Sequence, residues 1–171
     1  TGAAFVLFGL TWALSRRVNN YSLVDVTWSY ALIPLLAIYA TGTQGDATRK
    51  LLIGLMGTAW ALRLGTHLLL RVWAHHPGED ARYAVLRGKW RDRPGLKFFL
   101  FFQAQAALIV LLSLPHLLAM GNPESGIRLI EWTGLGIWFA GMIGEGAADR
   151  QLRRFKADPS NRGGVCAAGL W

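Results

Sequence analysis

Residues 98–120 read FFLFFQAQAALIVLLSLPHLLAM, a run of 23 residues without a charged side chain. A helix needs about 20 predominantly apolar residues to cross the hydrocarbon core of a bilayer. A second uncharged run of 20 residues extends from Val26 to Gly45. The chain has 171 residues, 53% of them hydrophobic, and a positive mean hydropathy. These blocks predict an integral membrane protein whose partner is the lipid bilayer.

The pattern of apolar runs and turn residues predicts an all-α fold, a polytopic transmembrane helix bundle in one domain, residues 1–171. Five spans are expected, at about residues 2–14, 23–41, 51–73, 97–120 and 127–148. A long connection, residues 74–96, joins the third and fourth spans, and a tail, residues 149–171, follows the fifth. The first span is partial and both ends look cut, so we expect the chain to be a piece of a longer protein.

The net charge of +8 is distributed unevenly over the connections. Lys and Arg gather in alternate connecting segments and not along one amphipathic face, which argues against a nucleic-acid partner and for membrane topology. One side carries twelve cations: Arg16, Arg17, Arg82, Arg87, Lys89, Arg91, Arg93, Arg150, Arg153, Arg154, Lys156 and Arg162. The other side carries three: Arg49, Lys50 and Arg128. We therefore predict that the twelve, including the tail, face the cytoplasm.

The third span carries ionisable residues at helical spacing. Arg63, His67 and Arg71 recur every four residues and so share one helical stripe. Small residues, which let helices approach closely, lie on roughly the opposite face: Gly57, Ala61 and Gly65. One face is therefore predicted to pack against a helix and the other to line a polar cavity. The alternative is that Arg63 and Arg71 extend to the headgroups and that His67 only packs.

Counting residues places other charges at a similar depth. Arg63 lies about 20 Å beyond Lys50 along a helix, and Glu145 lies about 21 Å beyond Glu131. Asp149 follows Glu145 by four residues, and Asp25 stands one turn inside the second span. Each has a structural alternative: an ion pair between Glu145 and an arginine, solvation of Asp149 at the interface, or a favourable helix dipole at Asp25. Their common level predicts a functional cavity that opens toward the cytoplasm.

The connection of residues 74–96 contains a turn at Pro77-Gly78, and Glu79 and Asp80 suit the first turn of a short helix. Its basic residues fit two ligands equally well, anionic lipid headgroups or the phosphates of a nucleotide cofactor. The sequence has no Gly-rich dinucleotide fingerprint, so a nucleotide site of the Rossmann type is not expected. The adjacent His75 and His76 and the single Cys166 do not make a metal site.

Four segments together resemble the bacterial steroid 5-alpha-reductase-like membrane proteins, a group often described only as a domain of unknown function. They are Arg63-Leu64-Gly65-Thr66-His67 with Arg71, Gly78-Glu79-Asp80-Ala81-Arg82-Tyr83, Glu145 to Leu152, and Gly169-Leu170-Trp171. The resemblance covers Tyr21 to Trp171. It implies a seven-helix membrane fold in a bacterial inner membrane, with NADPH bound from the cytoplasmic side. It also implies reduction of a carbon–carbon double bond in a lipophilic enone.

The same resemblance assigns roles to individual residues. Glu145 and Asp149 match the spacing of an Asn and an Asp that contact the cofactor in steroid reductases, and Arg153 is the best-placed phosphate contact. The predicted cofactor-binding set is Arg63, Arg82, Glu145, Asp149 and Arg153. Either Asp25 or His67 is expected to supply the proton, so both are candidate catalytic residues.

The chain departs from the resembled pattern at several positions. Leu68 stands where steroid reductases have a Tyr that contacts the substrate carbonyl, and Glu145 replaces an Asn. The family continues beyond the Gly-Leu-Trp segment with a Ser-Arg-His-Pro-Asn-Tyr type motif, which leaves the activity of this piece open. Two other functions stay in view: an isoprenylcysteine-type methyltransferase that uses S-adenosylmethionine, and a non-catalytic membrane protein whose buried charges hold helices together.

Overall fold

A computed structural model describes residues 2–171, which form six α-helices and one short 3-10 turn without a β-strand among them. This confirms the predicted all-helical class. The chain divides into two units, one that ends at Gly126 and a second that runs Ile127–Trp171.

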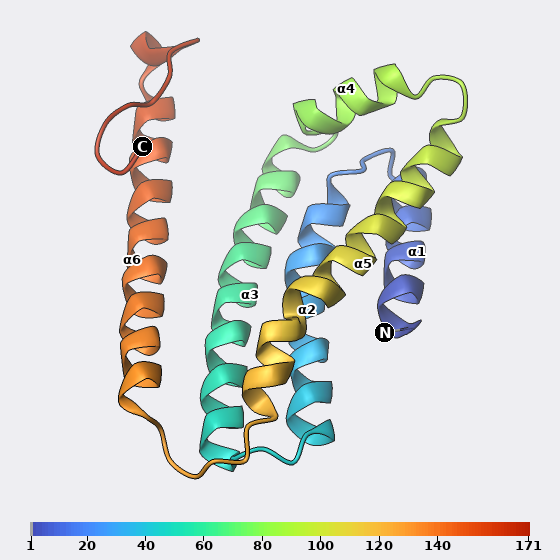
Figure 1. The fold of residues 1–171 in the computed structure, drawn as a ribbon. Helices are drawn as coiled ribbons and strands as arrows, with labels where there is room; N and C mark the ends of the chain where they lie inside the picture. The colour runs from blue at the N-terminus through green and yellow to red at the C-terminus, as the bar shows by residue number, and fades with distance from the viewer. Residues whose placement is uncertain (1) are drawn as a thin grey trace. The chain divides into compact units, whose positions relative to one another are not determined.

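Five helices make up the first unit: α1 Gly2–Arg17, α2 Leu23–Gly42, α3 Ala47–His75, α4 Ala81–Lys89 and α5 Pro94–Met120. The long helices alternate in direction, so the connection between α1 and α2 lies at the same end of the unit as α4 (Figure 1). We call this the α4 end. The connection between α2 and α3 and the end of α5 lie at the opposite end. Helix α2 packs against α1, α3 and α5 and is the centre of the unit.

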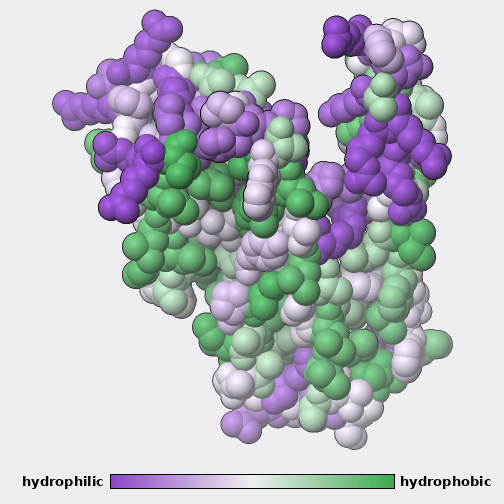
Figure 2. Space-filling view, turned by 180° about the vertical axis from the view of Figure 1, so that it is seen from behind, coloured by the Kyte–Doolittle hydropathy of each residue, from purple (hydrophilic) through white to green (hydrophobic). Residues whose placement is uncertain are grey.

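Three helices of this unit, α2, α3 and α5, are long and apolar enough to cross a membrane. Figure 2 shows hydrophobic side chains over the middle of the first unit and hydrophilic ones at its ends. Large apolar side chains such as Leu55, Leu111 and Leu118 are exposed on these helices, as expected where the solvent is lipid. The protein is therefore an integral membrane protein. The spans predicted at residues 2–14 and 127–148 fall on α1 and on the second unit's helix, and they stay predictions.

The core of the first unit is aromatic and aliphatic, and the small residues of α3 let α2 approach. The ring of Tyr21 stacks on that of Phe98, with centroids 3.6 Å apart. Gly57, Ala61 and Gly65 are all buried, which confirms the predicted packing face of this helix. A Cβ on Gly65 would lie 2.7 Å from the ring of Tyr30, so a larger residue would fit there only if that ring moved.

Arg49 closes the end of the unit opposite α4. Its side chain is only 2% exposed. The guanidinium donates hydrogen bonds to the carbonyl oxygens of Asn122 at 3.1 Å, Glu124 at 2.6 Å and Gly126 at 2.7 Å. These carbonyls follow the last turn of α5, and that of Asn122 also accepts from the backbone N–H of Asp46 at 3.0 Å. Arg49 therefore ties the start of α3 to the chain segment that follows α5.

The second unit consists of α6 Leu129–Ala157, the 3-10 turn Pro159–Asn161 and the tail that follows. The tail folds back along α6, as Figure 1 shows. The backbone N–H of Leu170 donates to Oε1 of Gln151 at 2.8 Å, and the indole N–H of Trp171 donates to the carbonyl of Ala148 at 2.7 Å. Gly169 has a φ of +73°, and a Cβ at this position would collide with the side chain of Gln151, so glycine suits this turn.

Candidate functional site

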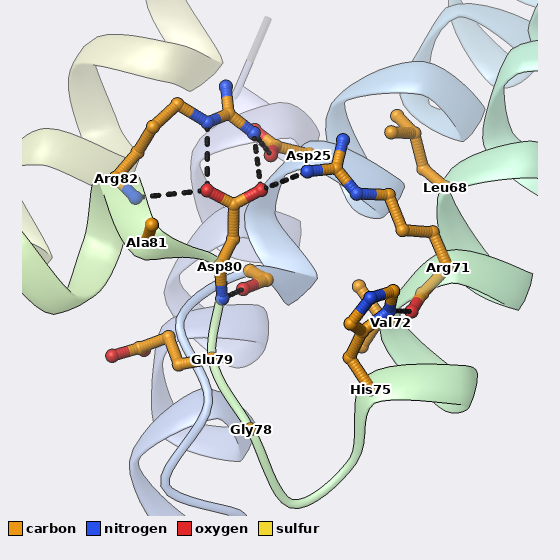
Figure 3. A pocket seen from close by; sticks show the side chains of 11 residues that line it. Asp25, Leu68, Arg71, Val72, His75, Gly78, Glu79, Asp80, Ala81 and Arg82 are labelled. Atoms are coloured by element: carbon orange, nitrogen blue, oxygen red, sulfur yellow. Dashed lines mark hydrogen bonds and ion pairs between the residues drawn. The ribbon is translucent and has the colours of Figure 1, made fainter. Parts of the chain in front are cut away.

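A pocket of about 190 Å³ lies at the α4 end of the first unit, where α2, α3 and the segment before α4 meet. Figure 3 shows its lining residues, with two arginines pointing toward the carboxylate of Asp80. Charged groups from three helices therefore meet beside the apolar spans. Its lining includes Ser22, Asp25, Leu68, Arg71, Asp80 and Arg82.

Asp25 stands in the first turn of α2 and accepts hydrogen bonds on both carboxylate oxygens. The phenol of Tyr83 donates to Oδ1 at 2.6 Å, and Nη2 of Arg82 donates to Oδ2 at 2.8 Å. Tyr83 is 4% exposed and does not line the pocket, whereas Asp25 does. Tyr83 therefore holds the carboxylate from behind and leaves it at the pocket wall.

Asp80 joins three helices. Its carboxylate caps α4 by accepting from the N–H of Arg82 at 3.0 Å, and its own N–H donates to Oγ of Ser22 at 3.0 Å. The side chains of Arg71 on α3 and Arg82 on α4 form ion pairs with it at 2.7 and 3.0 Å. Such charge-assisted bonds are the stronger kind of hydrogen bond. Asp80 thus fixes both guanidiniums at the pocket.

Glu79 and Gly78 attach the same segment to the start of α2. The Glu79 carboxylate accepts from the backbone N–H of Tyr21 at 2.6 Å and pairs with Arg87 at 3.0 Å. The side-chain amide of Asn20 donates to the carbonyl of Gly78 at 3.2 Å. Residues of the Gly78–Tyr83 segment therefore contact both α3 and the start of α2. The two adjacent carboxylates bind different arginines, Arg87 at Glu79 and Arg71 with Arg82 at Asp80.

These contacts shift the pKa values of Asp80, Arg82 and Tyr83. Hydrogen bonding by Arg82 is the main reason that the pKa of Asp80 lies below its usual value. Burial, followed by the hydrogen bond to Asp25, raises the pKa of Tyr83, so the phenol keeps its proton at neutral pH. Hydrogen bonding to Asp80 raises the pKa of Arg82, which stays charged. Near neutral pH, Asp80 is therefore negatively charged, Arg82 is positively charged and Tyr83 is neutral.

The lowered pKa of Asp80 predicts a loss of stability in acid. Because its pKa is lower in the folded than in the unfolded chain, Asp80 stabilises the fold fully above about pH 4 and loses this contribution as the pH falls through the lowered value. The Asp80→Asn variant, which keeps a capping oxygen, should therefore lose less free energy of unfolding than the parent between about pH 5 and pH 3. Denaturant unfolding at each pH, followed by tryptophan fluorescence, measures this difference.

Asp92→Asn is the matched control for that experiment. Asp92 pairs with Lys97 at 2.6 Å, but its carboxylate is exposed, so water screens the pair. The Asp92→Asn protein should keep most of the parent's loss of stability in acid. An equal loss in the parent and in Asp80→Asn would contradict the role given to Asp80.

The structure brings some predicted site residues together within the first unit. Asp25 and Arg82 form an ion pair at 2.8 Å at the pocket. His67 and Arg63 lie on α3 and are half-buried, and neither lines this pocket. Leu68, the neighbour of His67, does line it.

The other predicted residues, Glu145, Asp149 and Arg153, all lie on α6 in the second unit. Asp149 is half-buried and Glu145 and Arg153 are exposed. Within this unit the Gly169-Leu170-Trp171 segment bonds to α6 at Ala148 and Gln151, next to Asp149 in sequence. The expected common level of Glu145 with Arg63 and His67 spans the two units and stays a prediction.

Sequence reasoning missed the two residues that organise the pocket. Asp80 was expected only as part of a helix start, and Tyr83 only as the last letter of a motif. The signal lay in the spacing of Asp80, Arg82 and Tyr83, since a helix N-cap places the next three residues in its first turn. Within residues 2–171, no three His, Cys, Asp or Glu side chains gather in a way that could hold a metal ion.

The helical first unit with its charged pocket beside three long apolar helices defines the protein as an integral membrane protein of the helix-bundle class. Residues 11–171 match the model of the family described as "Protein of unknown function (DUF1295)". The chain therefore belongs to this family. No curated protein and no solved structure matches it.

Proposed function

We propose that this protein is a membrane-embedded reductase that uses NADPH to reduce a carbon–carbon double bond in a lipophilic enone. The observation that carries the proposal is the position of Asp25. Its carboxylate lies at a pocket wall beside the apolar spans, with Tyr83 behind it and the exposed arginines Arg71 and Arg82 at the same pocket. Ionisable groups in such a place are functional by default.

The donor set of the pocket fits the phosphate-bearing part of a dinucleotide. The side chains of Arg71 and Arg82 are 51% and 62% exposed, and guanidinium forks match phosphate oxygens. At about 190 Å³ the pocket is smaller than the 300–1,000 Å³ typical of sites that enclose a whole ligand, so it would hold one part of the cofactor. When bound, NADPH would supply a hydride to the β carbon of the enone.

The residues of the chain would then handle the proton. Arg82 could bind a phosphate through Nη1, because its bonds to Asp25 and Asp80 use Nε and Nη2. In its protonated form Asp25 would donate a hydrogen bond and then its proton to the substrate oxygen, and the enol formed after hydride addition would tautomerise to the saturated ketone. Tyr83 would act as a positioning residue, because its phenol bonds Asp25 from outside the pocket.

One position in the pocket departs from the resembled enzymes. Leu68 lines the pocket at the position where the resembled enzymes have a Tyr, and Tyr83 of α4 brings a hydroxyl to Asp25 instead. Glu145, Asp149 and Arg153 stay candidate cofactor contacts on α6 of the second unit. The proposed setting is a bacterial inner membrane, with the α4 end and the basic tail in the cytoplasm.

A non-catalytic role is the second candidate, and one observation favours it. The carboxylates of Asp25 and Asp80 are each bonded on both oxygens by residues of the chain itself, which is also what a clasp between helices requires. In that case no cofactor would bind, and substitutions here would change stability alone.

Ligand-induced stabilisation of the purified protein in lipid nanodiscs decides between these functions. NADPH at about 100 times its Kd should raise the free energy of unfolding by about 2.7 kcal/mol, and S-adenosylmethionine should leave it unchanged. Arg71→Gln should weaken NADPH binding by about tenfold because it removes a phosphate ligand. Arg93→Gln is the control, since Arg93 is exposed and does not line the pocket.

Absence of stabilisation by NADPH would sink the proposal. Stabilisation by S-adenosylmethionine would favour a methyltransferase, and stabilisation by neither would favour the clasp.

A further inference from the structure

A second pocket, of about 440 Å³, is lined by residues at the end of α1 and the beginning of α5. It shares no lining residue with the pocket at Asp25. Its lining includes three arginines from three different segments, Arg16 at the end of α1, Arg87 in α4 and Arg91 just before α5. No acidic residue lines it. The pocket is therefore built for an anion.

Of the three arginines at this pocket, one is neutralised by a carboxylate in the described part of the chain and two are not. Arg87 is neutralised by Glu79, with contacts of 3.0 and 3.1 Å. Among residues 2–171, neither Arg16 nor Arg91 has a carboxylate partner, and the nearby Asp92 is taken by Lys97 at 2.6 Å. Two positive charges therefore remain at the pocket, which is enough for one phosphate group.

The Arg16 guanidinium is held in place for this role by apolar and backbone contacts. Its Cζ lies 5.1 Å from the ring centroid of Trp12, and the indole N–H of Trp12 donates to the carbonyl of Gly95 at 3.0 Å. A Cβ on Gly95 would lie 3.8 Å from Cζ of Arg16, so the guanidinium is next to the first turn of α5. Orientation by Trp12 leaves the polar edge of the guanidinium available to a ligand.

Apolar surface begins directly beside the arginines. Leu14 and Val18 flank Arg16 on the chain, and Leu96 and Leu100 follow Gly95 along α5, and all four side chains are exposed. Helix α5 is one of the membrane-crossing helices, so its first turn lies at a membrane surface. A phosphate bound between Arg16 and Arg91 would thus stand over hydrocarbon-facing side chains.

We propose that this pocket binds the headgroup phosphate of an anionic phospholipid, with Arg16 and Arg91 as its ligands and the acyl chains lying on Leu96 and Leu100. A lipid is favoured over a nucleotide or free phosphate because the exposed leucines match acyl chains and would add nothing for a water-soluble anion. Basic pockets between transmembrane helices are a known form of lipid recognition.

The test measures lipid binding to the delipidated protein in detergent by native mass spectrometry and by thermal shift. Phosphatidylglycerol should bind and phosphatidylcholine, whose phosphate is balanced by a cation, should bind at least about fivefold more weakly. Arg16→Gln and Arg91→Gln should each weaken phosphatidylglycerol binding about fivefold and the double variant about 25-fold. Arg17→Gln, an exposed neighbour outside the pocket, should change it less than about twofold.

Several outcomes would overturn the proposal: equal binding of the two lipids, equal weakening by Arg17→Gln, or a double variant that binds like the parent. Competition by inorganic phosphate as strong as that by the lipid would identify a free-phosphate site. Displacement of the lipid by NADPH would assign the pocket to the cofactor. Lipid binding is measured without NADPH, so its failure is separate from a failure of the proposed reductase function.

Discussion

Asp25→Asn is expected to lower NADPH-dependent reduction of an enone by about 100-fold or more, because it removes the proposed proton donor while keeping an oxygen that Tyr83 can bond. The fold should persist, since Arg82 keeps its ion pair with Asp80 at 3.0 Å. Turnover is followed by NADPH absorbance with a lipophilic enone in nanodiscs. The drop should appear in kcat and not in the NADPH Kd.

Two comparisons make this result decisive. His67→Gln removes the other candidate acid, which is half-buried and does not line the pocket, and it should lower kcat less than about tenfold. Tyr83→Phe should lower kcat by an intermediate factor and shift its pH profile, as a positioning residue would. A large loss in His67→Gln with little loss in Asp25→Asn would assign the proton to His67.

Arg49→Ala is expected to cost about 4 kcal/mol of the free energy of unfolding, because hydrogen bonds to a charged group each contribute about 1.5–3 kcal/mol and are not additive. The substitution removes the guanidinium from the carbonyls of Asn122, Glu124 and Gly126, although that of Asn122 still accepts from the N–H of Asp46 at 3.0 Å. Unfolding in mixed detergent micelles, followed by circular dichroism, gives the value.

Two further variants test whether the geometry of the Arg49 guanidinium matters in addition to its charge. Arg49→Lys keeps the charge but cannot reach three carbonyls together, so about half of the loss should remain. Lys50→Met removes a neighbouring cation that makes one bond, to the carbonyl of Thr43 at 3.1 Å, and should cost less than about 1 kcal/mol. Equal losses in Arg49→Ala and Lys50→Met would show that the hydrogen bonds of Arg49 contribute little to the free energy of unfolding.

Features of the fold that depend on local pattern could be predicted from the sequence. The uncharged run before Met120 is long enough to dictate a helix, and Asp80 has the right position to cap a short one, Ala81–Lys89. The small residues at four-residue spacing in α3 identified its packing face, because that spacing returns to the same side of a helix.

The site was harder to predict, because its contacts join distant parts of the chain. Asp25 was a candidate by depth and Arg82 by charge, but the bond between them links residues 57 positions apart. Spacing gives the face on which a side chain lies and not its partner across a connection. The same limit hid Arg49, which the charge count treated as a topology signal although it is 2% exposed.

The reach of Arg49 also constrains how the protein is made. Its three acceptors lie 73, 75 and 77 residues later in the chain. At the usual pace of translation, about 5–20 residues per second, roughly 4–15 s pass before the ribosome has added the first of them. During that interval the guanidinium has none of these three acceptors. Closure of the bundle at this end is therefore a late event of biosynthesis, possible only after α5 has been inserted.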